Sequence, residues 1–165
     1  MKEQYKGEFI TEDDLKHAFD EMYVQRQIKS GAIKRHSYES MRYGGADLVT
    51  AEYYKGVYQI RAFEFKLKDW RKALGQAKEN LKFAHQSFIV LPSNQVKNAL
   101  ETGADFIKEN KIGIIGVDPV TKHWKIEKYA YSQKDDEISL SQEIFKLLLG
   151  EVNWFVANCD IWKKG

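Results

Sequence analysis

The sequence of 165 residues has one cysteine, two prolines and no long apolar run. Cys159 has no partner for an internal disulfide, and without a second cysteine or a close histidine cluster there is no zinc-site spacing. The polar start MKEQYKGEF is unlike a signal peptide, and apolar runs such as FIVL and IGIIGV are too short to span a bilayer. We therefore expect a soluble, cytoplasmic protein with no membrane partner.

Internal boundaries are also lacking. No Pro/Gly/Ser-rich stretch, long charge run or repeat divides the chain, and 43% hydrophobic residues are enough for a core. We predict a single domain over residues 1–165. Lysine and arginine (26) nearly balance aspartate and glutamate (24), so net charge is weak support for a polyanionic partner. Any interpretation as a nucleic-acid-binding protein depends on where the charges lie.

The hydropathy pattern alternates between helical and strand periods. Apolar residues at helical spacing predict a helix over 11–31, which Thr11 and Asp14 can cap. A polar stretch that can be extended covers 33–38, and strands over 46–52 and 57–66 flank a turn at Lys55-Gly56.

The second half of the chain also alternates between helical and strand patterns. Asp69 is a candidate cap for a helix reaching Ala84, and Pro92 ends a short buried strand. Further elements are expected in this order: a helix over 94–110, strands over 112–117 and 124–130 with a turn at Asp118-Pro119, and one or two helices over 140–162. The order predicts an α/β fold, with a mixed central β-sheet flanked by helices on both faces.

The segment AFEFKLK holds the first chemical signal. Glu64 and Lys66 are two residues apart, so a strand directs both side chains to one face, with Phe63 and Phe65 on the other. Charged side chains in a strand that otherwise looks buried are costly unless a metal, a partner or a ligand compensates them.

Asp47 lies in the preceding strand, where a hairpin brings its carboxylate beside Glu64. Mg²⁺ prefers hard oxygen ligands and is often held by one or two carboxylates, so Asp47, Glu64 and the backbone carbonyl of Phe65 are candidate ligands for Mg²⁺ or Mn²⁺. Such a metal activates water and polarises a phosphodiester, while Lys66 orients that water or stabilises the transition state. The number of metal ions stays open.

Three segments together, GADLV, EFK and KALGQAKENLKFAHQSFIVLP, resemble the PD-(D/E)xK (restriction-endonuclease-like) nuclease superfamily over residues 42–92. The resemblance implies a restriction-endonuclease-like αβα core and an Mg²⁺- or Mn²⁺-dependent deoxyribonuclease. It places the catalytic roles on Asp47, Glu64 and Lys66, and brings Gln76 near the active site. The RecB-like branch adds a glutamate from the first helix. Glu21 is the candidate for this position, and the resemblance does not assign it a role. Ala46 stands where the family name has proline, at a position that supplies no ligand.

Basic residues near this centre are candidates for nucleic-acid contacts: Arg42, Lys68, Arg71 and Lys72. The alternative is a solvated helix face, and for Asp47 and Glu64 the alternative is a structural ion pair with Lys66 or Arg61.

Other functions stay open beside a DNA nuclease. They are a non-catalytic nucleic-acid-binding or interaction module on the same fold, and a nuclease acting on RNA. The sequence does not distinguish endonuclease from exonuclease activity. The aromatic segment 152–162 is a candidate homodimer interface.

Overall fold

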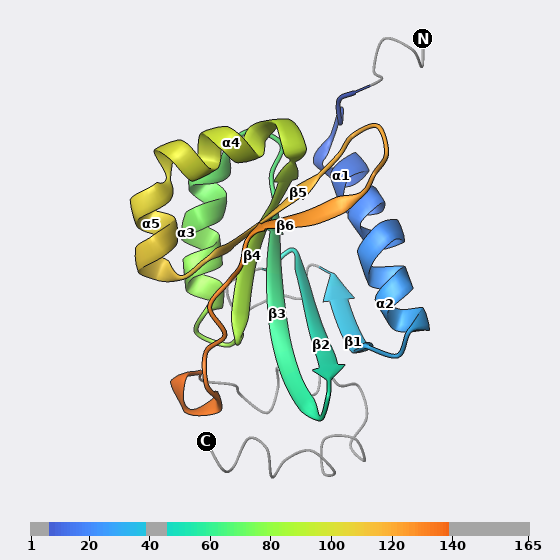
Figure 1. The fold of residues 1–165 in the computed structure, drawn as a ribbon, viewed down its shortest axis with the longest axis vertical. Helices are drawn as coiled ribbons and strands as arrows, with labels where there is room; N and C mark the ends of the chain where they lie inside the picture. The colour runs from blue at the N-terminus through green and yellow to red at the C-terminus, as the bar shows by residue number, and fades with distance from the viewer. Residues whose placement is uncertain (1–6, 39–45, 139–165) are drawn as a thin grey trace.

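The computed structural model of the chain describes residues 7–38 and 46–138. Six strands form one sheet in the order β1-β2-β3-β4-β5-β6, in which β3, β4 and β5 are parallel and the other neighbours are antiparallel (Figure 1). The elements in chain order are α1 (Glu12–Phe19), the π-helical turn η2 (Asp20–Val24), α2 (Gln25–Lys29), β1 (Ile33–Tyr38), β2 (Leu48–Tyr54), β3 (Val57–Phe65), α3 (Trp70–Asn80), β4 (Gln86–Pro92), α4 (Ser93–Thr102), α5 (Ala104–Asn110), β5 (Gly113–Val117), β6 (Trp124–Lys128) and the 3-10 turn η3 (Asp135–Glu137).

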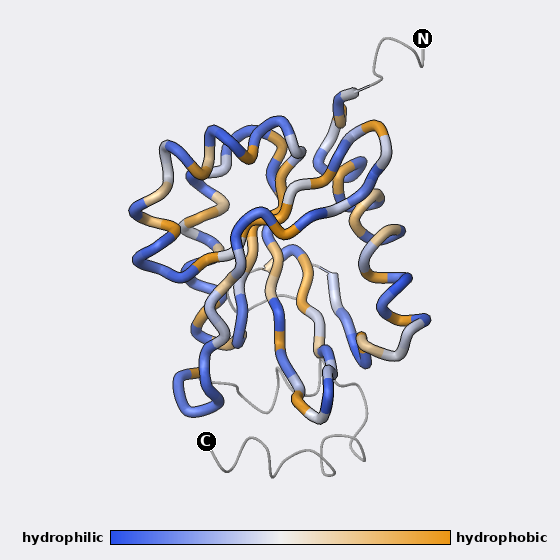
Figure 2. Tube along the Cα trace, viewed as in Figure 1, coloured by the Kyte–Doolittle hydropathy of each residue, from blue (hydrophilic) through white to orange (hydrophobic). Residues whose placement is uncertain are grey.

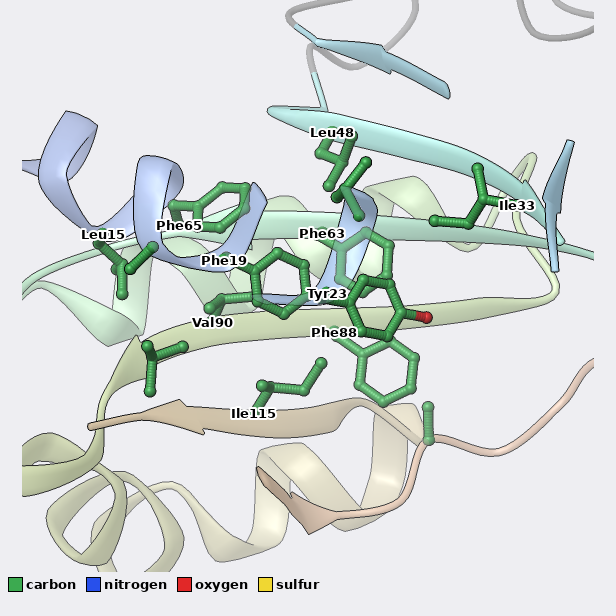
Figure 3. Packing of buried hydrophobic residues seen from close by; sticks show 14 residues of the cluster. Leu15, Phe19, Tyr23, Ile33, Leu48, Phe63, Phe65, Phe88, Val90 and Ile115 are labelled. Carbon is green, nitrogen blue, oxygen red and sulfur yellow. The ribbon is translucent and has the colours of Figure 1, made fainter. Parts of the chain in front are cut away.

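Helices cover both faces of the sheet, which confirms the predicted α/β architecture. On one face, Phe19 and Tyr23 pack over Phe63, Phe65 and Phe88 of the central strands (Figure 3). On the other face, α3, α4 and α5 enclose a second core that includes Trp70 and Ile89. Hydrophobic and hydrophilic residues alternate along the helices, as one-sided burial requires (Figure 2). Within residues 7–38 and 46–138, no helix is long and apolar enough to cross a membrane.

The first predicted helix is present, and its capping box is confirmed. The Thr11 hydroxyl accepts from the Asp14 amide at 3.1 Å, and the Asp14 carboxylate accepts from the Thr11 amide at 3.1 Å. A π-helical turn follows, across which the rings of Phe19 and Tyr23 stack with centroids 4.8 Å apart. The sequence period of three and four did not indicate this wider turn.

Some predicted bounds were wrong by a few residues: the strand predicted over 46–52 is Leu48–Tyr54, and the helix predicted to reach Ala84 ends at Asn80. The predicted helix 94–110 divides at Gly103, where a side chain would lie 2.9 Å from the Trp70 ring and 2.8 Å from the Ala99 carbonyl. The polar stretch 33–38 forms the edge strand β1. Asp69 is at the N-cap of α3, but its ψ of 64° lies outside the extended region that capping uses, and its side chain makes no capping hydrogen bond. The predicted helices of 140–162 lie outside the described residues.

Gly113 marks a close approach in the centre of the sheet. It pairs with Phe88 of the neighbouring parallel strand, and a Cβ atom at Gly113 would lie 2.4 Å from the Phe88 ring and 2.9 Å from the Ala130 Cβ. Such distances are far below van der Waals contact, so only glycine lets the ring lie against the β5 backbone.

We expect Gly113→Ala to lower the free energy of unfolding by about 1–3 kcal/mol, because the added methyl group overpacks the core around Phe88. The matched control is Gly75→Ala in α3, where the added Cβ meets no atom of the described residues within 4 Å apart from its chain neighbours and the backbone of its own helix. That change should stabilise the helix by about 0.5–1 kcal/mol. Urea unfolding of both variants measures the difference, and equal effects would contradict the close approach at Gly113.

Candidate active site

The strand register places Asp47 opposite Glu64. Leu48, the first residue of β2, pairs with Phe63 of antiparallel β3, so Asp47 continues the ladder against Glu64. Leu48 and Phe63 both point into the core beneath α1. Since side chains alternate across a strand, Asp47 and Glu64 both point to the α3 face. The predicted convergence of the two carboxylates is present in the structure.

Hydrogen bonds fix the two acids in place. The Phe65 amide donates to Asp47 Oδ2 at 2.9 Å, and the Asn80 side-chain amide donates to Glu64 Oε1 at 2.9 Å. Glu64 is fully buried, whereas Asp47 is half-buried. The contact with Phe65 is therefore through its amide, while the metal role predicted for its carbonyl stays a prediction.

Burial raises the pKa of Glu64 from an ordinary value of 4.5 to about 8. The Asn80 hydrogen bond lowers this pKa, the adjacent Asp47 carboxylate raises it, and the positive charge of Lys66 lowers it. Two carboxylates this close repel when both are ionised, and they share a hydrogen bond only when one carries a proton. A divalent cation removes the same repulsion without a proton.

Three buried oxygen atoms near this pair lack a hydrogen-bond partner among the described residues. They are Glu64 Oε2, Gln76 Oε1 and Asn80 Oδ1. Gln76 and Asn80 are one helical turn apart on the same side of α3, and Asn80 contacts Glu64 directly. Unsatisfied buried acceptors are costly, and all three atoms are of the hard oxygen type that Mg²⁺ prefers.

Asn80 is a member of this cluster that the sequence analysis missed. It is fully buried and continues the apolar stripe that Ala73 and Ala77 begin in α3. A polar residue within an apolar stripe was the available signal, because such a side chain is buried only with a polar partner. Gln76, which the family resemblance indicated, is half-buried on the same helix.

Lys66 directly follows β3, and its ammonium group lies 3.8 Å from Glu12 of α1. Its side chain keeps 21% exposure, so it is accessible to a ligand. Glu12 is thus the acid of the first helix that contacts Lys66, whereas the candidate Glu21 is exposed in η2. Arg61, the other proposed ion-pair partner, bonds to Glu52 instead, 3.4 Å away.

The predicted nucleic-acid-binding residues that the structure describes lie near the start of α3. Lys68, Arg71 and Lys72 are exposed where α3 begins, two to six residues after Lys66. The Arg71 guanidinium lies over the Trp70 ring, 4.4 Å from its centroid. Arg42 and the segment 152–162 lie outside the described residues.

In the part of the chain that the structure describes, no three His, Cys, Asp or Glu side chains form a metal-binding group. Comparison with protein-family models and with curated proteins finds no match to this chain. The resemblance to PD-(D/E)xK nucleases therefore stays a prediction, based on sequence motifs.

A second fully buried glutamate provides a contrast to Glu64. Glu52 accepts hydrogen bonds from Tyr23 at 2.8 and 2.9 Å, from Thr50 at 2.5 Å and from Tyr54, and its carboxylate lies 3.4 Å from Arg61. Both Glu52 oxygens are satisfied and a cation balances the charge. Glu52 thus has the features of a structural ion pair, whereas Glu64 has an unsatisfied oxygen and a neighbouring acid.

We expect Glu64→Gln to stabilise the metal-free protein at pH 8 by roughly 1–3 kcal/mol, because it removes an uncompensated buried charge. The pKa of Glu64 is raised on folding, so its stabilising contribution is complete below pH 4.5 and is lost as the pH rises towards 8. The advantage of the variant should therefore shrink as the pH falls towards 4.5. Urea unfolding in EDTA at several pH values measures it.

The matched control is Glu52→Gln, which removes the charge that balances half-buried Arg61. We expect this change to destabilise the protein by about 3 kcal/mol at pH 8. Destabilisation by both substitutions would mean that Glu64 is a structural residue of the same kind as Glu52.

Proposed function

We propose that this protein is a metal-dependent nuclease that hydrolyses DNA phosphodiester bonds with Mg²⁺ or Mn²⁺. The observation that carries the proposal is the pair of adjacent carboxylates, Asp47 and Glu64, with a buried unsatisfied oxygen on Glu64. A structural ion pair does not explain this arrangement, because Arg61 bonds to Glu52 and the Lys66 ammonium lies beside Glu12. The sequence resemblance to PD-(D/E)xK nucleases, which includes the same two acids, agrees with this proposal.

The residues present fit a hard divalent cation. Asp47 and Glu64 supply two carboxylates, and the backbone carbonyl of Phe65 is the third ligand that the sequence predicts. When bound, the metal supplies charge neutralisation at the phosphate and a water molecule of lowered pKa. The side-chain oxygens of Gln76 and Asn80 lack a hydrogen-bond partner within residues 7–38 and 46–138, and they can orient such a water by accepting its hydrogen bonds.

Lys66 is the cationic side chain for the reacting phosphate in this proposal. It directly follows β3, two residues after Glu64, and its positive charge lowers the pKa of Glu64. An ammonium group held here stabilises the negative charge that develops on phosphate oxygens. The Lys66 ammonium nitrogen lies 3.8 Å from a carboxylate oxygen of Glu12. In this proposal, Glu12 positions that ammonium group. Lys68, Arg71 and Lys72 extend positive charge from Lys66 along the start of α3.

We expect Glu64→Ala or Lys66→Ala to lower Mn²⁺-dependent DNA cleavage by at least about 100-fold, with the fold retained. The assay compares duplex, single-stranded and branched DNA, and an RNA strand. Lys55→Ala, in the turn at the other end of β3, is the control and should cleave as the wild type does. Full activity of either site variant would contradict the assigned roles.

Calorimetry separates catalysis from binding in the same variants. Mn²⁺ should bind the wild type and bind Asp47→Asn weakly or not at all. Metal and DNA binding without cleavage of any substrate would favour the non-catalytic module, and cleavage of RNA alone would favour the RNA-directed enzyme.

We expect the double variant Arg71→Glu, Lys72→Glu to weaken DNA binding at low salt and to flatten its dependence on salt concentration, because fewer counterions are released. Lys82→Glu is the control, since Lys82 follows the far end of α3 and pairs on the surface with Glu79. Fluorescence anisotropy over a salt series measures, for each variant, the slope of the logarithm of the binding constant against the logarithm of the salt concentration. Equal slopes for the two variants would mean that the Arg71 and Lys72 side chains form only a solvated helix face.

A further inference from the structure

A pocket of about 280 Å³ lies beside the residues that follow Lys66, at the end of the sheet where β3 and β4 end. Leu67 and Lys68, the two residues after Lys66, form one wall, and the end of β4 with the first turn of α4 forms another with Pro92, Asn94 and Gln95. The N-terminal segment closes the pocket with Glu8, Phe9 and Ile10. These three segments meet where β3 and β4 end, near the start of α1 (Figure 1).

The lining of the pocket combines flat apolar surface with amide groups. Phe9 and Leu67 are half-buried and pack against the core beneath α1, so their positions are fixed from below. Ile10 is 54% exposed although it is a large apolar side chain. Asn94 and Gln95 each offer a donor and an acceptor, which is the pattern that reads the edges of nucleobases.

Charge favours a neutral occupant. Glu8 and Lys68 are the ionisable residues of the lining, and their charges are opposite. A phosphate binds best where positive charge dominates, whereas an aromatic ring, aliphatic side chains and carboxamides suit a stacked base. Bases of a single strand are free to turn out of a stack into such a pocket.

The geometry points to a binding site for one unpaired nucleobase, that of a nucleotide close to the phosphate held at Asp47 and Glu64. This inference rests on the proposed nuclease function for the position of that phosphate. The site implies a preference for single-stranded or frayed DNA over intact duplex, because a paired base cannot enter the pocket without leaving its stack.

The test uses the Glu64→Gln protein, which should bind DNA without cutting it. Its affinity for a fluorescein-labelled single-stranded 12-mer of thymidine is compared with that for 12-mers in which one nucleotide at a time is abasic. We expect the abasic change to weaken binding about 5- to 100-fold at one or two neighbouring positions. Uniform effects along the strand would overturn the inference.

Ile10→Asp should remove this position dependence and keep the fold, because the Ile10 side chain is exposed. Val57→Asp is the matched control: Val57 is also 54% exposed and lies at the opposite end of β3. Asn94→Ala is the second variant, because Asn94 is exposed and should alter discrimination between thymine and the other bases. Unchanged position dependence in both pocket variants, with folding verified by circular dichroism, would also overturn the inference.

These experiments test the pocket inference and the nuclease proposal separately. If the wild type cleaves DNA in Mn²⁺ but shows no position dependence, the pocket is refuted while the nuclease proposal stands. If position dependence is present and disappears in Ile10→Asp, but no DNA or RNA is cleaved, the pocket stands and the nuclease proposal fails.

Discussion

The antiparallel register between β2 and β3 is the constraint on which the candidate site depends. Leu48 pairs with Phe63, and both side chains belong to the core beneath α1. A slip of one residue would move Phe63 and Phe65 out of that core and bring Glu64 into it. The aromatic contacts of Phe63 with Phe19, Tyr23 and Phe88 oppose such a slip. Packing on one face of the sheet thus holds the two acids together on the other.

The cost of this arrangement shows in the contrast between the two buried glutamates. Three hydroxyl groups and a guanidinium surround Glu52, whereas Glu64 has one amide donor and a second acid beside it. A fold selected only for stability has little reason to retain the second arrangement, since an apolar residue would fit the surroundings of Ala62 and Ile89. Uncompensated charge at a fixed position is a common feature of sites that bind a cation or carry out catalysis.

Sequence reasoning predicted the parts of the site that depend on local periodicity. Alternation along β3 placed Glu64 opposite in direction to Phe63 and Phe65, and the hairpin around Lys55-Gly56 brought Asp47 to it. Contacts between distant segments were beyond that reasoning. The approach of Glu12 to Lys66 depends on how α1 crosses the sheet, and no periodicity within α1 encodes it. Asn80 could have been noticed in its apolar stripe, but its partner could not be named.

The chain topology explains why the acids, the lysine and the pocket share one end of the sheet. β3 and β4 are parallel and both end there, while antiparallel β2 begins there. Residues that follow β3 therefore lie beside the end of β4 and the first turn of α4, at the end of the sheet where β2 begins (Figure 1). In open α/β sheets, ligands bind outside the carboxyl ends of the parallel strands for this reason. Strand β3 holds Glu64 in place, while exposed side chains outside the strands, such as Ile10, Lys68 and Asn94, line the pocket and can vary without disturbing the core.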